Sequence, residues 1–241
     1  MDYLVVFILI SFLILIHELG HLIAAKLSNI PIERFSIGFG PKLCGLKKGK
    51  TEYRLSVFTI GGYVLPEIKN LNDFYQIPSS KRIVYALGGP SANLLLSIIL
   101  SAVYNTASTG FSLYGILLYP FAQVLKITSQ FLYALPSLFA DPGQLSGIVG
   151  VVAIGGQLVA GDLLKILQLA IILNINLALL NLLPLPPLDG GKILFCLLEQ
   201  IHRSLIKLRI PVMVTGWALL LSLICYITVV DVCRHVLRIW T

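Results

Sequence analysis

The sequence predicts an α-helical polytopic membrane protein with about four transmembrane helices and a small membrane-associated β-sheet between the first and second. Of its 241 residues, 57% are hydrophobic and only 12% are charged, and the mean hydropathy is +0.89. A soluble domain normally carries about 25% charged residues. The apolar residues also fall into long blocks, and a helix needs about 20 such residues to cross a bilayer. Lipid is therefore the expected surroundings of much of the chain.

Four blocks have the length and composition of membrane spans: 3–27, 83–104, 163–184 and 211–232. A fifth apolar stretch, 111–139, is broken by Pro120, Lys126 and Pro136, so we expect an interfacial or re-entrant segment there. The first block has no basic flank and is too long for a cleaved signal peptide, so we expect it to be retained. We expect the whole chain, 1–241, to form one domain.

Basic residues predict the orientation. Ten lysines and arginines lie from Lys26 to Arg82, only two between the second and third spans, and four between the third and fourth. The positive-inside rule then places loops 28–82 and 185–210 in the cytoplasm and both termini outside. Arg234 and Arg238 near the C-terminus argue mildly against this. Because the net charge of +7 is explained by these loops, we expect no nucleic-acid partner.

The loop after the first block is predicted to be rich in β-structure over residues 32–66. Its segments "IERFSIGFG" and "TEYRLSVFTIGGYVLPE" are rich in β-branched and aromatic residues, and "GFGPK" and "LKKGK" supply turns. We expect a small antiparallel sheet at the cytoplasmic boundary of the membrane. Non-helical backbone at that depth must pack on protein or line a wet cavity.

The first span contains the motif "HELGH", with His17, Glu18 and His21. On a helix, residues four apart share one face, so the two imidazoles can bind one Zn²⁺. Glu18 lies beside them, where it can take a proton from a metal-bound water. An ionisable residue near the centre of a span costs roughly 2.5–3.5 kcal/mol on the insertion scale, so such residues are usually functional. The alternative is a trio that packs helices or caps a loop.

A catalytic zinc ion needs a third protein ligand. The only other histidines, His202 and His235, fall in a cytoplasmic loop and in the outer tail. Asp189 follows the third span in a segment broken by prolines and glycines, 184–191. The first and third spans run in the same direction, so Asp189 reaches the side where the motif lies, whereas an additional span at 111–139 would move it to the opposite face. We expect Asp189 to be the third ligand; the alternative is that it caps the helix that starts at 190–192, and the two roles are compatible.

Several blocks together resemble a known family. In chain order they are "HELGH", "RFSIGFGPKL", "GGYV", "LGGPSANLLLS", "QLSGIVG" and "NINLALLNLLPLPPLDGGKILF". This series covers most of the chain and resembles the site-2 proteases, which are intramembrane zinc metalloproteases. It is most similar to the bacterial regulator-of-sigma-E protease branch. The resemblance implies that His17, His21 and Asp189 bind one zinc ion and that Glu18 is the general base.

The resemblance also implies residues that hold the substrate. Asn176 and Asn181, ahead of the "LDGG" turn, would contact the substrate backbone, although by themselves they are equally compatible with helix packing. Gly61, Gly62 and Tyr63 end a strand that looks like the β-element with which this family binds an unwound substrate strand.

The implied function is an intramembrane zinc endopeptidase. It would hydrolyse peptide bonds in transmembrane helices, from single-span proteins or signal-peptide remnants, near the cytoplasmic face of a bacterial plasma membrane. Two features depart from the family. Residues 105–145 are too few for the PDZ domains that this branch usually carries there, and Lys192 stands where relatives often have histidine.

Two other functions remain open. A catalytically silent membrane protein that binds helices would use the same cavity, but the intact Glu18 argues against it. A zinc transporter would need ligands on several spans, and no predicted span outside the motif contains a histidine.

Overall fold

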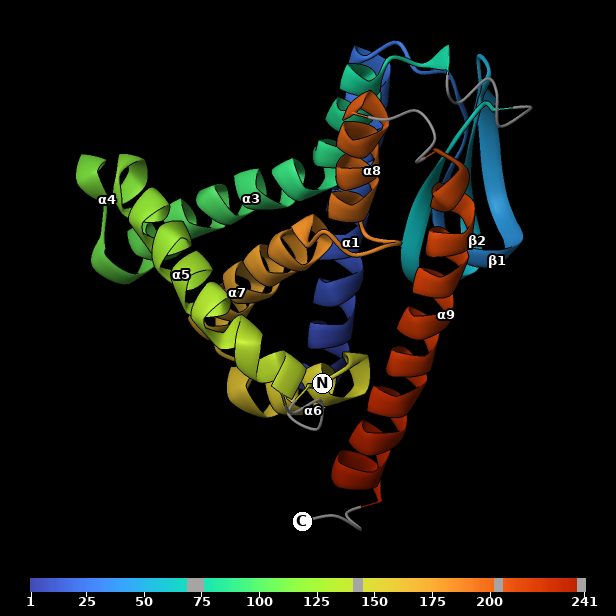
Figure 1. Ribbon diagram of the computed structural model, residues 1–241. Helices are drawn as coiled ribbons and strands as arrows, with labels where there is room; N and C mark the ends of the chain where they lie inside the picture. Colours follow the sequence, from blue (N-terminus) through green and yellow to red (C-terminus); the bar gives the residue numbers. More distant parts are fainter. Residues whose placement is uncertain (69–75, 141–144, 202–205, 238–241) are drawn as a thin grey trace. The chain divides into compact units, whose positions relative to one another are not determined.

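A computed structural model describes residues 1–68, 76–140, 145–201 and 206–237 (Figure 1). The chain divides into two compact units. Unit 1 comprises 1–10, 94–176 and 214–241, and unit 2 comprises 11–93 and 177–213. The candidate metal ligands all belong to unit 2.

Four helices in the described part of the chain are long and apolar enough to cross a membrane. They are α1 (Asp2–Leu27), α3 (Ser79–Thr109), α7 (Leu163–Leu182) and α9 (Ile206–Asp231), the last continuing into a short π-helical turn, η3 (Val232–Val236). Many of their apolar side chains are exposed, such as Leu219 at 67% and Val229 at 60% on α9. Lipid is the medium that makes such exposure favourable, so the predicted class of a four-span helical membrane protein is confirmed.

The predicted sheet between the first two spans is also confirmed. It consists of two long antiparallel strands in unit 2, β1 (Ile32–Lys48) and β2 (Thr51–Pro66) (Figure 1). Gly49, with a φ of +64°, turns the chain between them. The strands bend, so that Phe35 pairs with Tyr53 on one side and with Val64 on the other. Within the described residues, 62–65 of β2 pair only with 34–37, which leaves their second edge unpaired.

The hydrophobic core of unit 2 joins this sheet to α1. The side chains of this core are nearly all inaccessible to solvent, and they are Leu22, Ala25, Ile30, Ile32, Phe35 and Val64. Leu22 and Ala25 come from the last turns of α1, directly after the "HELGH" motif. Burial of these side chains therefore fixes the sheet beside the helix that carries the motif.

Small residues bring α1 and α3 into close contact in unit 2. A Cβ atom on Gly20 would lie 2.3 Å from the carbonyl oxygen of Gly88, and one on Gly88 would lie 2.6 Å from the Cβ atom of Ala24. Pairs of small residues four apart are a common interface between membrane helices, because they let the backbones approach. Here the approach places α3 directly against the histidine-bearing face of α1.

Unit 1 contains the segment between the second and third spans. Over 111–139, where the sequence predicted an interfacial or re-entrant segment, the structure has α4 (Leu113–Leu117) and α5 (Tyr119–Ala140), which contact each other. Although α5 has 22 residues, it is not among the four helices apolar enough to be candidate spans. Its depth in the membrane stays a prediction.

The carboxylate of Asp231 connects the end of α9 to the start of α6 (Ile148–Val159). Asp231 is 1% exposed, and its Oδ2 accepts hydrogen bonds from the backbone N–H groups of Gly147 and Gly150, at 2.9 and 2.8 Å. These are the free donors at the start of α6, where a negative charge is also favoured by the helix dipole. Asp231 therefore caps α6 from a distant part of the chain.

Candidate functional site

Three buried side chains of unit 2 meet at one point. His17 and His21 lie one turn apart on α1 and are each 5% exposed, and Asp189 is the first residue of α8 (Asp189–Ile201) and is 3% exposed. The two histidine Nε2 atoms are 3.1 Å apart, and each lies 3.1 Å from Oδ2 of Asp189. The three possible ligand atoms thus form an equilateral triangle.

This triangle fits a zinc ion. Ligand atoms 2.0–2.1 Å from a tetrahedral zinc lie about 3.3 Å from one another, close to the spacing seen here. Two imidazoles and one carboxylate are three protein ligands, and catalytic zinc sites keep the fourth position open for water or substrate. Among the described residues, this is the one cluster of histidine, cysteine and acidic side chains with a spacing suited to a metal.

Groups on α3 orient the two imidazoles. Nδ1–H of His21 donates to the backbone oxygen of Tyr85 at 2.8 Å, which turns the lone pair of its Nε2 toward the centre of the triangle. The Asn93 amide lies 3.1 Å from Nδ1 of His17. The amide nitrogen Nδ2 is the atom that faces the ring, so Asn93 contacts this imidazole from α3 and holds it in place. Asn93 is completely buried.

Gly89 brings the α3 backbone up to the triangle. A Cβ atom at this position would lie 2.5 Å from Nε2 of His17 and 2.5 Å from Nε2 of His21. A side chain here would therefore occupy the space that a metal ion needs. Sequence reasoning singled out neither Gly89 nor Asn93, although both fall in "LGGPSANLLLS" and a polar residue inside a span was the available signal.

Lys192 contacts the second oxygen of Asp189. Its Nζ donates to Oδ1 at 2.8 Å, which leaves Oδ2 to the two histidines. Burial favours the neutral acid, but the imidazoles of His17 and His21 and the ammonium group of Lys192 hold the pKa of the Asp189 carboxyl well below its ordinary value. Asp189 is therefore a carboxylate, which is the form that binds metal.

The far end of α8 is fixed by a buried ion-pair cluster. Glu199 accepts from Arg82 at 2.7 Å and from Arg209 at 3.1 Å, and the three side chains are at most 10% exposed. Arg82 stands near the start of α3, and Arg209 stands near the start of α9. Asp189 thus lies on a helix that is anchored at both ends. No local sequence pattern indicates this cluster, because its members come from three separate segments.

Glu18 lies beside the triangle and next to the sheet. Its side chain is half-buried, and a Cβ atom on Gly62 would lie 3.2 Å from its Cγ. Gly62 of β2 therefore lies against the Glu18 side chain. Gly61 has a φ of +115° and packs against the ring of Phe39. The ring of Tyr63 stacks on Phe39, and its hydroxyl accepts from Arg54.

The remaining candidates are less closely tied to the triangle. Asn181 on α7 is half-buried, and its Nδ2 donates to the backbone oxygen of Leu177 at 2.9 Å, in its own helix. Asn176 is half-buried on α7 and belongs to unit 1. His235 lies in η3, also in unit 1, and His202 lies outside the described residues.

The chain is similar to provisionally named zinc metalloproteases along nearly its whole length. A protein of Campylobacter jejuni is 27% identical, over 97% of this chain and 94% of its own length. One of Synechocystis is 26% identical, over 92% of both chains, and one of Clostridium perfringens is 26% identical, over 95% of this chain and 98% of its own. These alignments span 328 to 344 positions, more than the 241 residues here, so the relatives contain stretches without a counterpart in this chain.

The sequence model of peptidase family M50 matches residues 5–224. The match includes the buried His17, His21 and Asp189 and extends across all four apolar helices. The chain therefore belongs to peptidase family M50, the site-2 protease family of metalloproteases.

Proposed function

We propose that this protein is an intramembrane zinc endopeptidase that cuts transmembrane helices near the cytoplasmic face. Single-span proteins and signal-peptide remnants are the proposed substrates. Membership of family M50 supports proteolysis. The observation that carries the proposal is the buried triangle of two imidazole nitrogens and one carboxylate oxygen, each 3.1 Å from the others, in a chain with four apolar helices.

His17, His21 and Asp189 are the proposed ligands of one zinc ion, which supplies a Lewis acid for the scissile carbonyl and for the attacking water. Glu18 is the proposed general base, which accepts a proton from that water at its carboxylate and then returns it to the leaving amine. Asn93 and the Tyr85 carbonyl keep the imidazoles in position.

The unpaired edge of β2 is the proposed binding site for the substrate backbone. The carbonyls of a helix are hidden in its own hydrogen bonds, so a substrate must unwind before water can attack. An exposed strand edge can take over the released backbone groups by β-addition. Gly61, Gly62 and Tyr63 lie on this edge, and Gly62 adjoins Glu18, so an added strand would pass beside the base. Asn176 and Asn181 are proposed as further donors to the substrate backbone.

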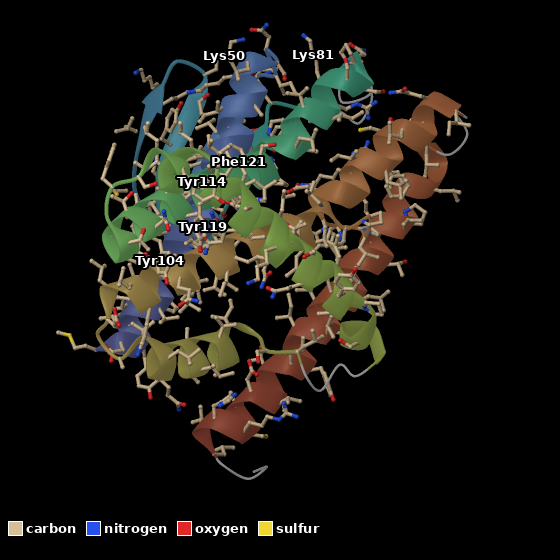
Figure 2. The ribbon with its side chains drawn as sticks, turned by 90° about the vertical axis from the view of Figure 1, so that its left-hand side faces the viewer. Lys50, Lys81, Tyr104, Tyr114, Tyr119 and Phe121 are labelled. Carbon is tan, nitrogen blue, oxygen red and sulfur yellow. The ribbon has the colours of Figure 1, made fainter. Side chains whose placement is uncertain are left out.

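The proposed setting is a bacterial plasma membrane, with the active site toward the cytoplasm and both termini outside. The basic residues of the first loop support this orientation. Lys50 at the β-turn and Lys81 at the start of α3 lie toward the same end of unit 2 (Figure 2). The lipid bilayer and transmembrane substrates are the proposed partners.

The direct test is cleavage of a model single-span substrate by the purified chain in detergent. Glu18→Gln should lower the rate about 10²–10⁴-fold, since it removes the proton transfer and leaves the zinc ligands intact. Glu33→Gln is a matched control because Glu33 is an exposed residue of β1.

Two outcomes would contradict the proposal. Cleavage by Glu18→Gln at the rate of the unmodified chain would remove Glu18 from the mechanism. No cleavage by either protein, across several helix-destabilised substrates and with zinc bound, would favour the catalytically silent helix-binding protein.

A further inference from the structure

Unit 1 contains a cavity that peptide hydrolysis does not use. Its volume is about 380 Å³, and it lies among α3, α5 and α7. Its lining is mixed: six side chains carry polar groups, and the apolar residues Ala122, Ile127 and Ile172 complete it; the six are Tyr104, Tyr119, Gln123, Lys126, Gln130 and Gln168. Figure 2 shows Tyr104 on α3 and Tyr119 at the start of α5. The polar atoms of this lining can hydrogen-bond a polar group that enters the cavity.

Helix α5 turns its polar face toward this cavity. Tyr119, Gln123, Lys126 and Gln130 recur every three or four residues, so they share one side of the helix, and all four line the cavity. Ala122 and Ile127 of the same helix also line the cavity, whereas Phe121, Leu125 and Leu132 do not and are 54%, 68% and 55% exposed. Helix α5 therefore combines a polar side, on which Lys126 and Gln130 are themselves exposed, with exposed apolar side chains suited to lipid.

The charge of the cavity points to an anion. Lys126 is the one charged residue among the described residues that line it. The Tyr104 and Tyr119 hydroxyls and the glutamine amides add hydrogen-bond donors suited to phosphate oxygens. In contrast, Oε1 of Gln123 is buried without a hydrogen-bond partner in the described structure. An occupant that satisfies both needs has an anionic group for Lys126 and a hydroxyl donor for Gln123.

The position along the helices points to a lipid headgroup. Tyr104 stands five residues before the end of α3, and Gln168 stands five residues after the start of α7. At 1.5 Å per residue, each is about 7–8 Å from its helix end, which is the depth of the polar region of a bilayer. Tyr114, Tyr119 and Phe121 provide aromatic side chains of the kind that gather at this interface (Figure 2).

We propose that this cavity binds the headgroup of an anionic, hydroxylated phospholipid, of which phosphatidylglycerol is the simplest. The phosphate accepts hydrogen bonds from Lys126 and from the phenol and amide donors, and a glycerol hydroxyl donates to Oε1 of Gln123. The acyl chains lie along the apolar outer face of α5. A phosphatidylcholine headgroup is a poor ligand for this cavity. Its choline group brings a second cation near Lys126 and has no hydroxyl to donate to Gln123.

Native mass spectrometry of the delipidated full chain tests this assignment. The probes are short-chain phosphatidylglycerol, phosphatidylcholine and phosphatidylethanol with the same acyl chains, and glycerol 1-phosphate. The unmodified protein should bind phosphatidylglycerol at least about tenfold more tightly than phosphatidylcholine, as loss of one charge-assisted hydrogen bond implies. Lys126→Ala should lose this preference. Gln123→Leu should bind phosphatidylglycerol and phosphatidylethanol equally, because ethanol lacks the extra hydroxyls.

Lys165→Ala is the matched control. Lys165 is exposed near the start of α7 and does not line the cavity. This variant should bind phosphatidylglycerol like the unmodified chain, and thermal unfolding should show that all variants are folded. Equal binding by Lys126→Ala, or an equal loss in Lys165→Ala, would overturn the site. Binding of glycerol 1-phosphate as tight as that of the lipid would overturn the choice of a lipid as occupant.

Discussion

At the scale of single residues, the proposed metal site depends on a missing side chain, at Gly89, as much as on its proposed ligands. Two histidines one turn apart were predictable because residues four apart share a helix face. Gly89 and Asn93 were not, since they reach the motif only through the crossing of α1 and α3, and one sequence does not reveal which faces of two helices meet. The contact of Lys192 with Asp189 likewise depends on where α8 begins.

Gly89→Ala should abolish zinc binding while the protein stays folded. The added methyl group would lie 2.5 Å from both histidine Nε2 atoms, in the space that the ion needs. Metal analysis of the purified variant, together with its thermal unfolding, measures the two effects separately. Leu87→Ala is the control because Leu87 is exposed on the same helix. Full zinc occupancy in Gly89→Ala would show that the ion binds elsewhere.

At the scale of elements, the sheet was predictable and the segment after α3 was only partly so. The β-branched and aromatic residues and the glycine turns indicated strands, and β1 and β2 cover 32–66 apart from their turn. In contrast, Pro120 and Pro136 were expected to break 111–139, yet both lie within α5. Pro120 stands in the first turn, where no N–H is needed. A local pattern cannot show that a helix continues through Pro136, because packing decides this.

The β-hairpin is cross-linked by Glu52, which accepts from Lys42 at 2.6 Å and from Arg34 at 2.9 Å. The hydrogen bond from Lys42, followed by that from Arg34, lowers the pKa of Glu52 to about 2. A lowered pKa means that the ion pairs stabilise the hairpin above the ordinary value of 4.5, and that this contribution is lost as the pH falls through about 2.

Carbon-13 NMR of the Glu52 carboxyl should therefore give a titration midpoint well below 4.5. The midpoint should rise in Lys42→Ala, because this variant lacks the hydrogen bond that lowers the pKa of Glu52 most. A midpoint at the ordinary value in the unmodified protein would mean that the ion pairs do not form in solution.

At the scale of the whole molecule, membrane topology and the metal site depend on each other. With the N-terminus outside, as proposed, Asp189 reaches the cytoplasmic side only if the chain crosses the bilayer an odd number of times before α8. The spans α1, α3 and α7 meet this condition, provided that α5 does not cross. The resemblance to a protease family could be recognised from the sequence because its motifs are local. The cavity in unit 1 could not, because its lining comes from three helices.

The proposed orientation predicts that Cys44 is reached by thiol reagents only from the cytoplasm. Cys44 is exposed on β1, in the first loop. In a variant that keeps Cys44 alone, an impermeant maleimide should label inside-out vesicles but not intact cells. Ser112→Cys in the same background is the control, because it lies before α4 on the opposite side and should show the reverse pattern. Labelling of Cys44 in intact cells would invert the topology.

Removal and return of zinc during substrate cleavage tests the proposed catalytic metal site most directly. The purified chain should contain one zinc ion, lose cleavage of a single-span substrate when a chelator removes the metal, and recover cleavage when zinc is restored. Asp189→Ala should fail to recover, because the triangle loses one of its three ligand atoms. Cleavage that continues in the metal-free protein would contradict the assignment of His17, His21 and Asp189 as the ligands of a catalytic zinc.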